Sequence, residues 1–156
     1  MATPEFQMTQ ILPHEGRMLL IDELLEQHDE GIVTALTIRA DSVMCDGVTG
    51  VPAWVGMEYM AQTACAYSGV NQARSGEQPS ISLLLGTRSY KALVPVFALG
   101  ARLIVDARLI VRDDDDLAVF DCSIRDAATN AELARGDIKA IRPKNLQALI
   151  DEQLCG

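Results

Sequence analysis

The sequence predicts an α+β fold in which an antiparallel sheet packs against one long helix. Only the stretch from Pro52 to about Ala73 has the length and apolar spacing of a long helix. Strand-like segments with alternating or β-branched residues precede this helix and then follow it several times. The later segments are joined by short connections, which suit antiparallel neighbours in one sheet.

The elements are expected in a simple order along the chain. Pro13 and Gly16 interrupt a short N-terminal segment, and residues 18–27 mix strand and helix signals. A strand over residues 31–40 leads into the polar loop 41–50, which precedes the helix. After the helix we expect strands over residues 81–93, 97–112, 117–127 and 132–143, with hairpin connections at 113–116 and 126–131 and a short amphipathic helix at 144–154.

The long helix carries an unusual mixture of residues. Pro52 suits its first turn, where the missing N–H costs no hydrogen bond. Helical spacing places four residues on one face of this helix: Trp54, Glu58, Gln62 and Cys65. Small side chains keep much of the helix slim, so that a surrounding sheet can approach it closely on more than one side: Ala61, Ala64, Cys65 and Ser68.

Composition restricts the class of protein. The 156 residues are 49% hydrophobic and show no repeat or linker, so one domain over residues 1–156 is expected. A net charge of −9 argues against a nucleic-acid partner. No run of eighteen apolar residues predicts a membrane span, and the first residues do not resemble a secretory signal, so a cytoplasmic location is expected.

The possible metal ligands are sparse. The four cysteines are scattered and there are only two histidines, His14 and His28, so no metal site is expected and the cysteines are expected as free thiols. The four aspartates at 113–116 are expected at a solvated hairpin tip, because consecutive carboxylates in an extended turn point in different directions.

Three segments resemble the hotdog-fold 3-hydroxyacyl-[acyl-carrier-protein] dehydratases of the FabZ/FabA type. They are ILPHEGRMLLIDELLE (11–26), PAWVGMEYMAQ (52–62) and GTRSYKALVPVFALGARLIV (86–105). The resemblance covers about residues 9–142. The helix motif is similar to that of a branch of dehydratases associated with aryl polyene or related polyketide-type pathways.

The resemblance implies a fold and an activity. It implies a hotdog dimer, a sheet wrapped around a central helix, with sites at the subunit interface. The substrate would be a 3-hydroxyacyl thioester on the phosphopantetheine of an acyl carrier protein, as in fatty acid or polyketide synthesis. Dehydration gives a 2-enoyl thioester and needs no metal or soluble cofactor. A histidine on the loop before the helix handles the C2 proton, and an acid on the facing subunit's helix handles the hydroxyl.

Residues of the helix match the family's site. Glu58 matches the helix acid, and a carboxyl group in an apolar tunnel is disfavoured as an anion, which suits a general acid. Ala53 matches a position whose backbone N–H supports the thioester carbonyl. Gln62, one turn beyond Glu58, could line the same wall and orient the acid, or could be a partly exposed helix residue. Trp54 could close the tunnel mouth or anchor the helix to the sheet.

The histidine of the family is missing. Counting back from Glu58 to its usual place leads to Met44, and the loop 41–50 contains no histidine at all. A methionine side chain cannot transfer the proton. Replacements from this chain are Asp46, Cys45 and His14, although the simpler interpretations are a solvated loop acid, a small apolar filler and a packing histidine.

Three functions therefore stay open. The chain could be an active 3-hydroxyacyl thioester dehydratase that uses Glu58 with another base. It could be a non-catalytic hotdog subunit that binds acyl carrier protein or pairs with an active dehydratase, as a homodimer or a heteromer. It could also be a hotdog acyl thioesterase. Basic residues near the matched segments are candidates for meeting an acidic carrier protein: Arg17, Arg74, Arg88, Lys91 and Arg102.

Overall fold

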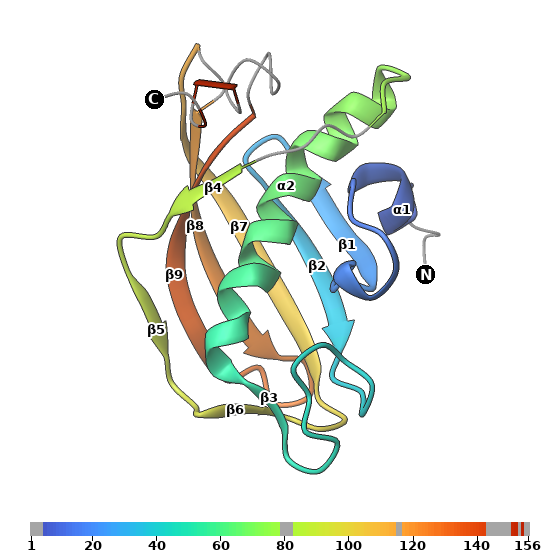
Figure 1. Ribbon diagram of the computed structural model, residues 1–156, viewed down its shortest axis with the longest axis vertical. Helices are drawn as coiled ribbons and strands as arrows, with labels where there is room; N and C mark the ends of the chain where they lie inside the picture. The colour runs from blue at the N-terminus through green and yellow to red at the C-terminus, as the bar shows by residue number, and fades with distance from the viewer. Residues whose placement is uncertain (1–4, 79–82, 115–116, 143–150, 153, 155–156) are drawn as a thin grey trace.

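A curved antiparallel sheet lies against one face of a long helix, as Figure 1 shows. The computed structural model describes residues 5–78, 83–114, 117–142, 151–152 and 154. The long helix α2 (Gly56–Arg74) crosses the sheet and contacts β2, β7, β8 and β9. This confirms the α+β class and the hotdog arrangement that the resemblance implies.

The sheet is antiparallel throughout. Its strands lie side by side in the order β1 (Glu23–His28), β2 (Gly31–Thr37), β7 (Arg102–Arg112), β8 (Leu117–Asp126), β9 (Glu132–Ile141) and β4 (Leu83–Gly86). The short strand β5 (Tyr90–Ala92) pairs with another part of β9. A separate two-stranded sheet joins β3 (Gly50–Pro52) to β6 (Val96–Ala98) at the beginning of the helical region.

The two faces of the large sheet differ in chemistry. In β8 every second residue is buried, namely Ala118, Phe120, Cys122 and Ile124, and these face the helix. The opposite face carries cross-strand ion pairs such as Arg108–Asp121 and a close pair between Arg125 and Asp106. One face therefore builds the main core, and the other combines these ion pairs with a small buried apolar cluster of Val33, Ala35 and Ile104.

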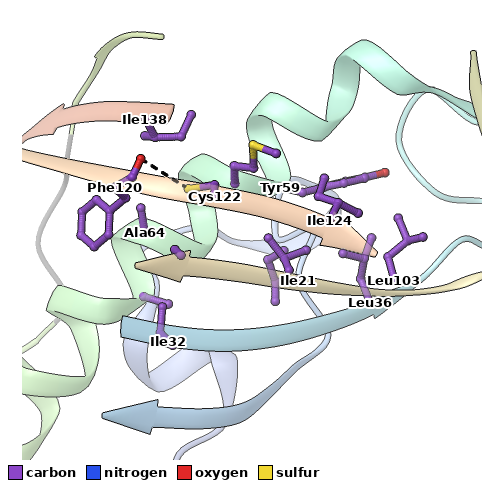
Figure 2. Packing of buried hydrophobic residues seen from close by; sticks show 14 of the residues in the cluster. Ile21, Ile32, Leu36, Tyr59, Ala64, Leu103, Phe120, Cys122, Ile124 and Ile138 are labelled. Carbon is purple, nitrogen blue, oxygen red and sulfur yellow. Dashed lines mark hydrogen bonds between the residues drawn. The ribbon is translucent and has the colours of Figure 1, made fainter. Parts of the chain in front are cut away.

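The core lies between α2 and the inner face of the sheet (Figure 2). Tyr59 packs against Phe97, with ring centroids 5.9 Å apart. The buried Thr63 hydroxyl donates to the Tyr59 carbonyl at 2.8 Å and lies 2.8 Å from the Thr34 hydroxyl, so the polar atoms at this contact are partnered. Buried residues occur around much of the helix, as its small side chains indicate.

The beginning of the helix differs from the sequence prediction. Pro52 ends β3 with extended backbone angles (φ −54°, ψ 136°), and the short 3-10 helix η2 (Ala53–Val55) precedes α2. The Ala53 N–H donates to the Pro95 carbonyl at 3.0 Å. This bond continues the β3–β6 pairing, so the α-helix begins four residues later than predicted.

Two of the predicted strands are interrupted. The run 81–93 divides into β4 and β5 at Gly86, where φ is +148°, and the run 97–112 divides into β6 and β7 at Gly100, where φ is +86°. Both glycines adopt backbone conformations that L-residues rarely accept, which lets the chain turn between strands.

The terminal segments are only partly described. Two short helices, α1 (Met8–Ile11) and η1 (Gly16–Met18), lie on either side of Pro13, in agreement with the predicted break. Most of the helix predicted over residues 144–154 lies outside the described residues. Within the described part of the chain, no helix is both long and apolar enough to cross a membrane.

Gly69 allows α1 to approach the central helix, which gives the first testable prediction. A Cβ atom at this position would lie 1.7 Å from the Ile11 carbonyl oxygen. Gly69→Ala should therefore lower the free energy of unfolding by about 1–3 kcal/mol, the usual cost of overpacking. Urea denaturation measures this change. Asn71→Ala, at an exposed position of the same helix, is the control, and equal stability of the two variants would contradict the close approach.

Candidate functional site

A cavity of about 140 Å³ opens between α2 and the inner face of the sheet. Its helix wall is a continuous stripe of α2: Glu58, Ala61, Gln62, Ala64, Cys65 and Ser68. Its opposite wall comes from β4, β7, β8 and β9: Leu84, Arg112, Ala118, Phe120, Ala140 and Ile141. His14 and Arg142 complete the described lining. Three of the four residues of the predicted helix face, Glu58, Gln62 and Cys65, therefore border a cavity, whereas Trp54 is not part of the described lining.

Gln62 orients Glu58 from within the protein. Gln62 is 1% exposed, and its Nε2 donates to Glu58 Oε1 at 3.1 Å and to the Met18 carbonyl at 2.8 Å. Its Oε1 accepts from the Leu20 N–H at 2.9 Å. Both the nitrogen and the oxygen of the amide thus have partners, and the half-buried carboxyl of Glu58 is held at the cavity wall. The interpretation of Gln62 as a partly exposed residue is wrong.

His14 lies at the same cavity. Its Nδ1 atom is buried and has no hydrogen-bond partner among the described residues. The sequence left this histidine open between a replacement for the missing base and a packing residue, and the structure places it in the lining of the cavity that also contains Glu58 and Gln62. An imidazole nitrogen without a partner next to a carboxyl-bearing cavity can bind a polar group of a ligand.

Met44 occupies an exposed position on the loop before the helix. Its side chain is 54% exposed, and its backbone has φ of +67°, in the left-handed region. Among non-glycine residues, histidine adopts this region more readily than most, so the backbone here is compatible with the histidine that the resemblance to the dehydratases places at this position. Met44 does not belong to the described lining of the cavity that contains Glu58.

Asp46 organises the Met44 loop rather than serving as a base. Its Oδ1 accepts from the backbone N–H groups of Val48, Thr49 and Gly50 at 2.9, 2.7 and 3.0 Å, and its Oδ2 accepts from the Thr49 hydroxyl. The Thr49 hydroxyl and these backbone donors hold the pKa of Asp46 well below its ordinary value. A carboxylate stabilised in this way is a weak proton acceptor.

The helix entrance positions Ala53 and Trp54. The Ala53 N–H already donates to Pro95, so a thioester carbonyl would have to share or replace that bond. The Ala53 carbonyl accepts from the Tyr90 hydroxyl, and burial raises the pKa of Tyr90 to about 12, which keeps this donor protonated. Trp54 is 56% exposed, so the helix-anchor interpretation is wrong, and a role at the tunnel mouth stays a prediction.

A protein-family model for ApeP dehydratases, described as ApeP-like, matches residues 6–151 of the sequence. The chain belongs to the ApeP-like dehydratase family. This membership confirms the resemblance to hotdog dehydratases and shows a dehydratase-like protein. A search of curated proteins found no match to the sequence.

Several solved structures are similar to this chain. The dehydratase heterocomplex ApeI:P from Xenorhabdus doucetiae contains a chain with 28% identity and a TM-score of 0.82, covering 94% of this chain and 96% of that one. AziG of S. sahachiroi matches with 17% identity and a TM-score of 0.58, covering 79% and 91% of the two chains. The PaaI protein of E. coli matches with 15% identity and a TM-score of 0.57, covering 77% and 78%. The last two similarities show the fold alone.

Some of the cavity residues could not be identified from the sequence. Arg112, Phe120 and Ala140 reach the cavity through strand register, which depends on pairing between distant segments. The place of Ser68 in the lining could have been predicted from the sequence, because Ser68 continues the helical stripe three residues beyond Cys65. Among the described residues, no group of three or more acidic, histidine or cysteine side chains is arranged to hold a metal ion.

The hydrogen bonds of Asp46 give a prediction about pH. Because its pKa is lowered on folding, the charged form stabilises the protein above the unfolded pKa of about 3.9, and this stabilisation is lost as the pH falls further. Asp46→Asn should therefore be less stable than the wild type at pH 7, and the difference should shrink below about pH 4. Thermal unfolding across pH 3–7 tests this. A difference that is independent of pH would contradict a role for the charge.

Proposed function

We propose that this chain is one hotdog subunit of an acyl-thioester dehydratase, and that it completes its site with a histidine-bearing hotdog partner. The proposal rests on a difference between two positions, Glu58 on the helix and Met44 on the loop before it. Glu58 is held at a cavity wall by the buried Gln62, whereas the resemblance to the dehydratases puts Met44 at the place of their proton-abstracting histidine. The similar chain in the ApeI:P structure belongs to a dehydratase heterocomplex, which supports a heteromeric arrangement.

In the proposed mechanism the partner supplies the base and this chain supplies the acid. The partner's loop histidine takes a proton from C2 of the 3-hydroxyacyl thioester. The electron pair of that C–H bond forms the C2–C3 double bond as the C3–O bond breaks. Glu58 donates its proton to the departing hydroxyl, which leaves as water. Transfer of the proton from the histidine back to Glu58, directly or through water, restores both groups for the next turnover.

The candidate bases of this chain are less suited to taking the C2 proton than a histidine of the partner. The Asp46 carboxylate is committed to four donors. Cys45 Sγ accepts from the Gly47 N–H at 3.4 Å, within the same loop. His14 is the strongest internal alternative, because it lines the Glu58 cavity with an unpartnered nitrogen among the described residues. Turnover by the isolated chain that is lost in His14→Gln would favour that alternative over a heteromeric site.

The substrate class follows from the same proposal. The acyl group would be carried on the phosphopantetheine of an acyl carrier protein in the cytoplasm, in synthesis of a fatty acid or polyketide type, without a metal or soluble cofactor. Two of the basic residues considered for carrier docking are paired within the chain, Arg74 with Glu5 and Arg102 with Glu23. Arg88 and Lys91, around β4 and β5, are therefore better candidates for meeting an acidic carrier.

Replacement of Glu58 tests the proposed role directly. Glu58→Gln keeps the shape of the side chain and a hydrogen bond with Gln62, but removes the transferable proton. In a complex with the histidine-bearing partner, formation of the enoyl thioester should fall by about 10²–10⁴-fold, the usual contribution of a general acid. The rate is measured by absorbance of the conjugated product, with the substrate loaded on carrier protein.

The matched control is Glu77→Gln, an exposed acid beyond the other end of α2, which should leave the rate unchanged. Gel filtration of each variant with the partner separates loss of chemistry from loss of assembly. Full activity of a correctly assembled Glu58→Gln complex would show that this chain does not supply the acid.

A further inference from the structure

Tyr90 of β5 reaches the beginning of the helical region, where its hydroxyl contacts one peptide unit. The hydroxyl donates to the Ala53 carbonyl, which also accepts from the Gly56 N–H. The approach depends on Gly56, because a Cβ atom at that position would lie 2.3 Å from the Tyr90 oxygen. The ring also lies close to Gly136 of β9, where a Cβ atom would lie 3.2 Å from Tyr90 Cδ2. Two glycines therefore leave room for this tyrosine to reach the Ala53 carbonyl.

The helix does not require this hydrogen bond for its own backbone. The Gly56 N–H already bonds to the Ala53 carbonyl, so the Tyr90 hydroxyl is a second donor to the same oxygen. Hydrogen bonds that meet in one peptide unit polarise one another, so a second donor at the carbonyl strengthens the N–H of that unit as a donor. In this peptide unit the N–H belongs to Trp54.

The Trp54 N–H is the donor that this arrangement leaves available. The Ala53 carbonyl and the Trp54 N–H belong to one planar trans peptide unit and point in opposite directions, so fixing the carbonyl also fixes the N–H. Trp54 lies at the start of the helical segment, where N–H groups have no acceptor within the helix. Among the described residues it has no backbone acceptor in another element. The Ala53 N–H, by contrast, donates to the Pro95 carbonyl at 3.0 Å.

We propose that Tyr90 is a positioning residue for the thioester, because its hydroxyl aims the Trp54 N–H at the thioester carbonyl and strengthens that N–H as a donor. The inference rests on the proposed function for the presence of a thioester at the helix start. It gives to Trp54 the role that the resemblance gives to the N–H of Ala53. Negative charge develops on the carbonyl oxygen as the C2 proton leaves, and an N–H that is already oriented stabilises this charge without further rearrangement.

Tyr90→Phe removes the hydroxyl and keeps the ring. In the complex with the histidine-bearing partner it should lower kcat by about tenfold, the effect of one hydrogen bond. KM for a carrier-bound substrate should stay the same, because the interaction strengthens in the transition state. Tyr67→Phe is the matched control and should leave kcat unchanged, since the Tyr67 hydroxyl also donates to a backbone carbonyl, that of Asp29. Thermal unfolding and gel filtration check that each variant folds and assembles.

Gly56→Ala breaks the same hydrogen bond while the tyrosine stays in the chain. The added methyl group takes the place of the hydroxyl and displaces it from the Ala53 carbonyl. The loss of kcat should therefore match that of Tyr90→Phe. The double variant should lose no more than either single variant, because both changes remove one interaction.

The infrared stretch of a ¹³C-labelled thioester carbonyl measures the hydrogen bond itself. The probe is a saturated acyl thioester on carrier protein, which has no 3-hydroxyl group and therefore binds without being dehydrated. On binding to the wild-type complex its carbonyl frequency should fall below the value in solution. The decrease should be smaller in Tyr90→Phe, and it should be complete in Tyr67→Phe.

Two results would overturn the inference: a carbonyl frequency that is unchanged by Tyr90→Phe, and losses of kcat that add up in the double variant. The probe separates this inference from the proposed function. Turnover that depends on Glu58, together with an unchanged carbonyl frequency in Tyr90→Phe, would refute the role of Tyr90 alone. A frequency that depends on Tyr90, without turnover that depends on Glu58, would refute the proposed function and retain the role of Tyr90 in holding the thioester.

Discussion

The arrangement of the site depends on the hydrogen bonds of one buried amide. Gln62 joins α2 to the backbone of the N-terminal segment at Met18 and Leu20, and it also contacts the Glu58 carboxyl. Loss of the amide would leave those partly buried backbone groups without their partner, which would lower the stability of the contact. The segment that bears His14 and the helix that bears Glu58 are therefore held together by the same side chain that orients the acid.

Glu58 and Met44 are held in place by different interactions. Glu58 stands on a helix that packs against the sheet, and its position is fixed by packing and by Gln62. Met44 stands on a loop that is organised by Asp46 through local hydrogen bonds. The loop is kept in order although, by the resemblance to the dehydratases, Met44 stands where they carry a histidine. This combination favours a subunit that works with a partner over a subunit that works alone.

The sequence predicted the fold class, the long helix and the cavity-facing stripe through Glu58 and Gln62, because these follow from periodicity within a single segment. It placed the start of α2 four residues too early, since the Ala53 N–H bonds to Pro95, a residue more than forty positions away. The division of two strands at Gly86 and Gly100 is visible only in the backbone angles. The sheet wall of the cavity, including Arg112, depends on long-range strand register, which one sequence does not encode locally.

The central claim is that Glu58 of this chain works with a histidine of a second subunit. The most direct measurement uses a partner whose own helix acid has been replaced by glutamine, so that only a composite site can be complete. Assembled with the wild-type chain, this partner should still convert a carrier-bound 3-hydroxyacyl thioester, and assembled with Glu58→Gln it should not. If the acid-deficient partner is inactive with the wild-type chain although the complex forms, Glu58 is not the acid of the reaction.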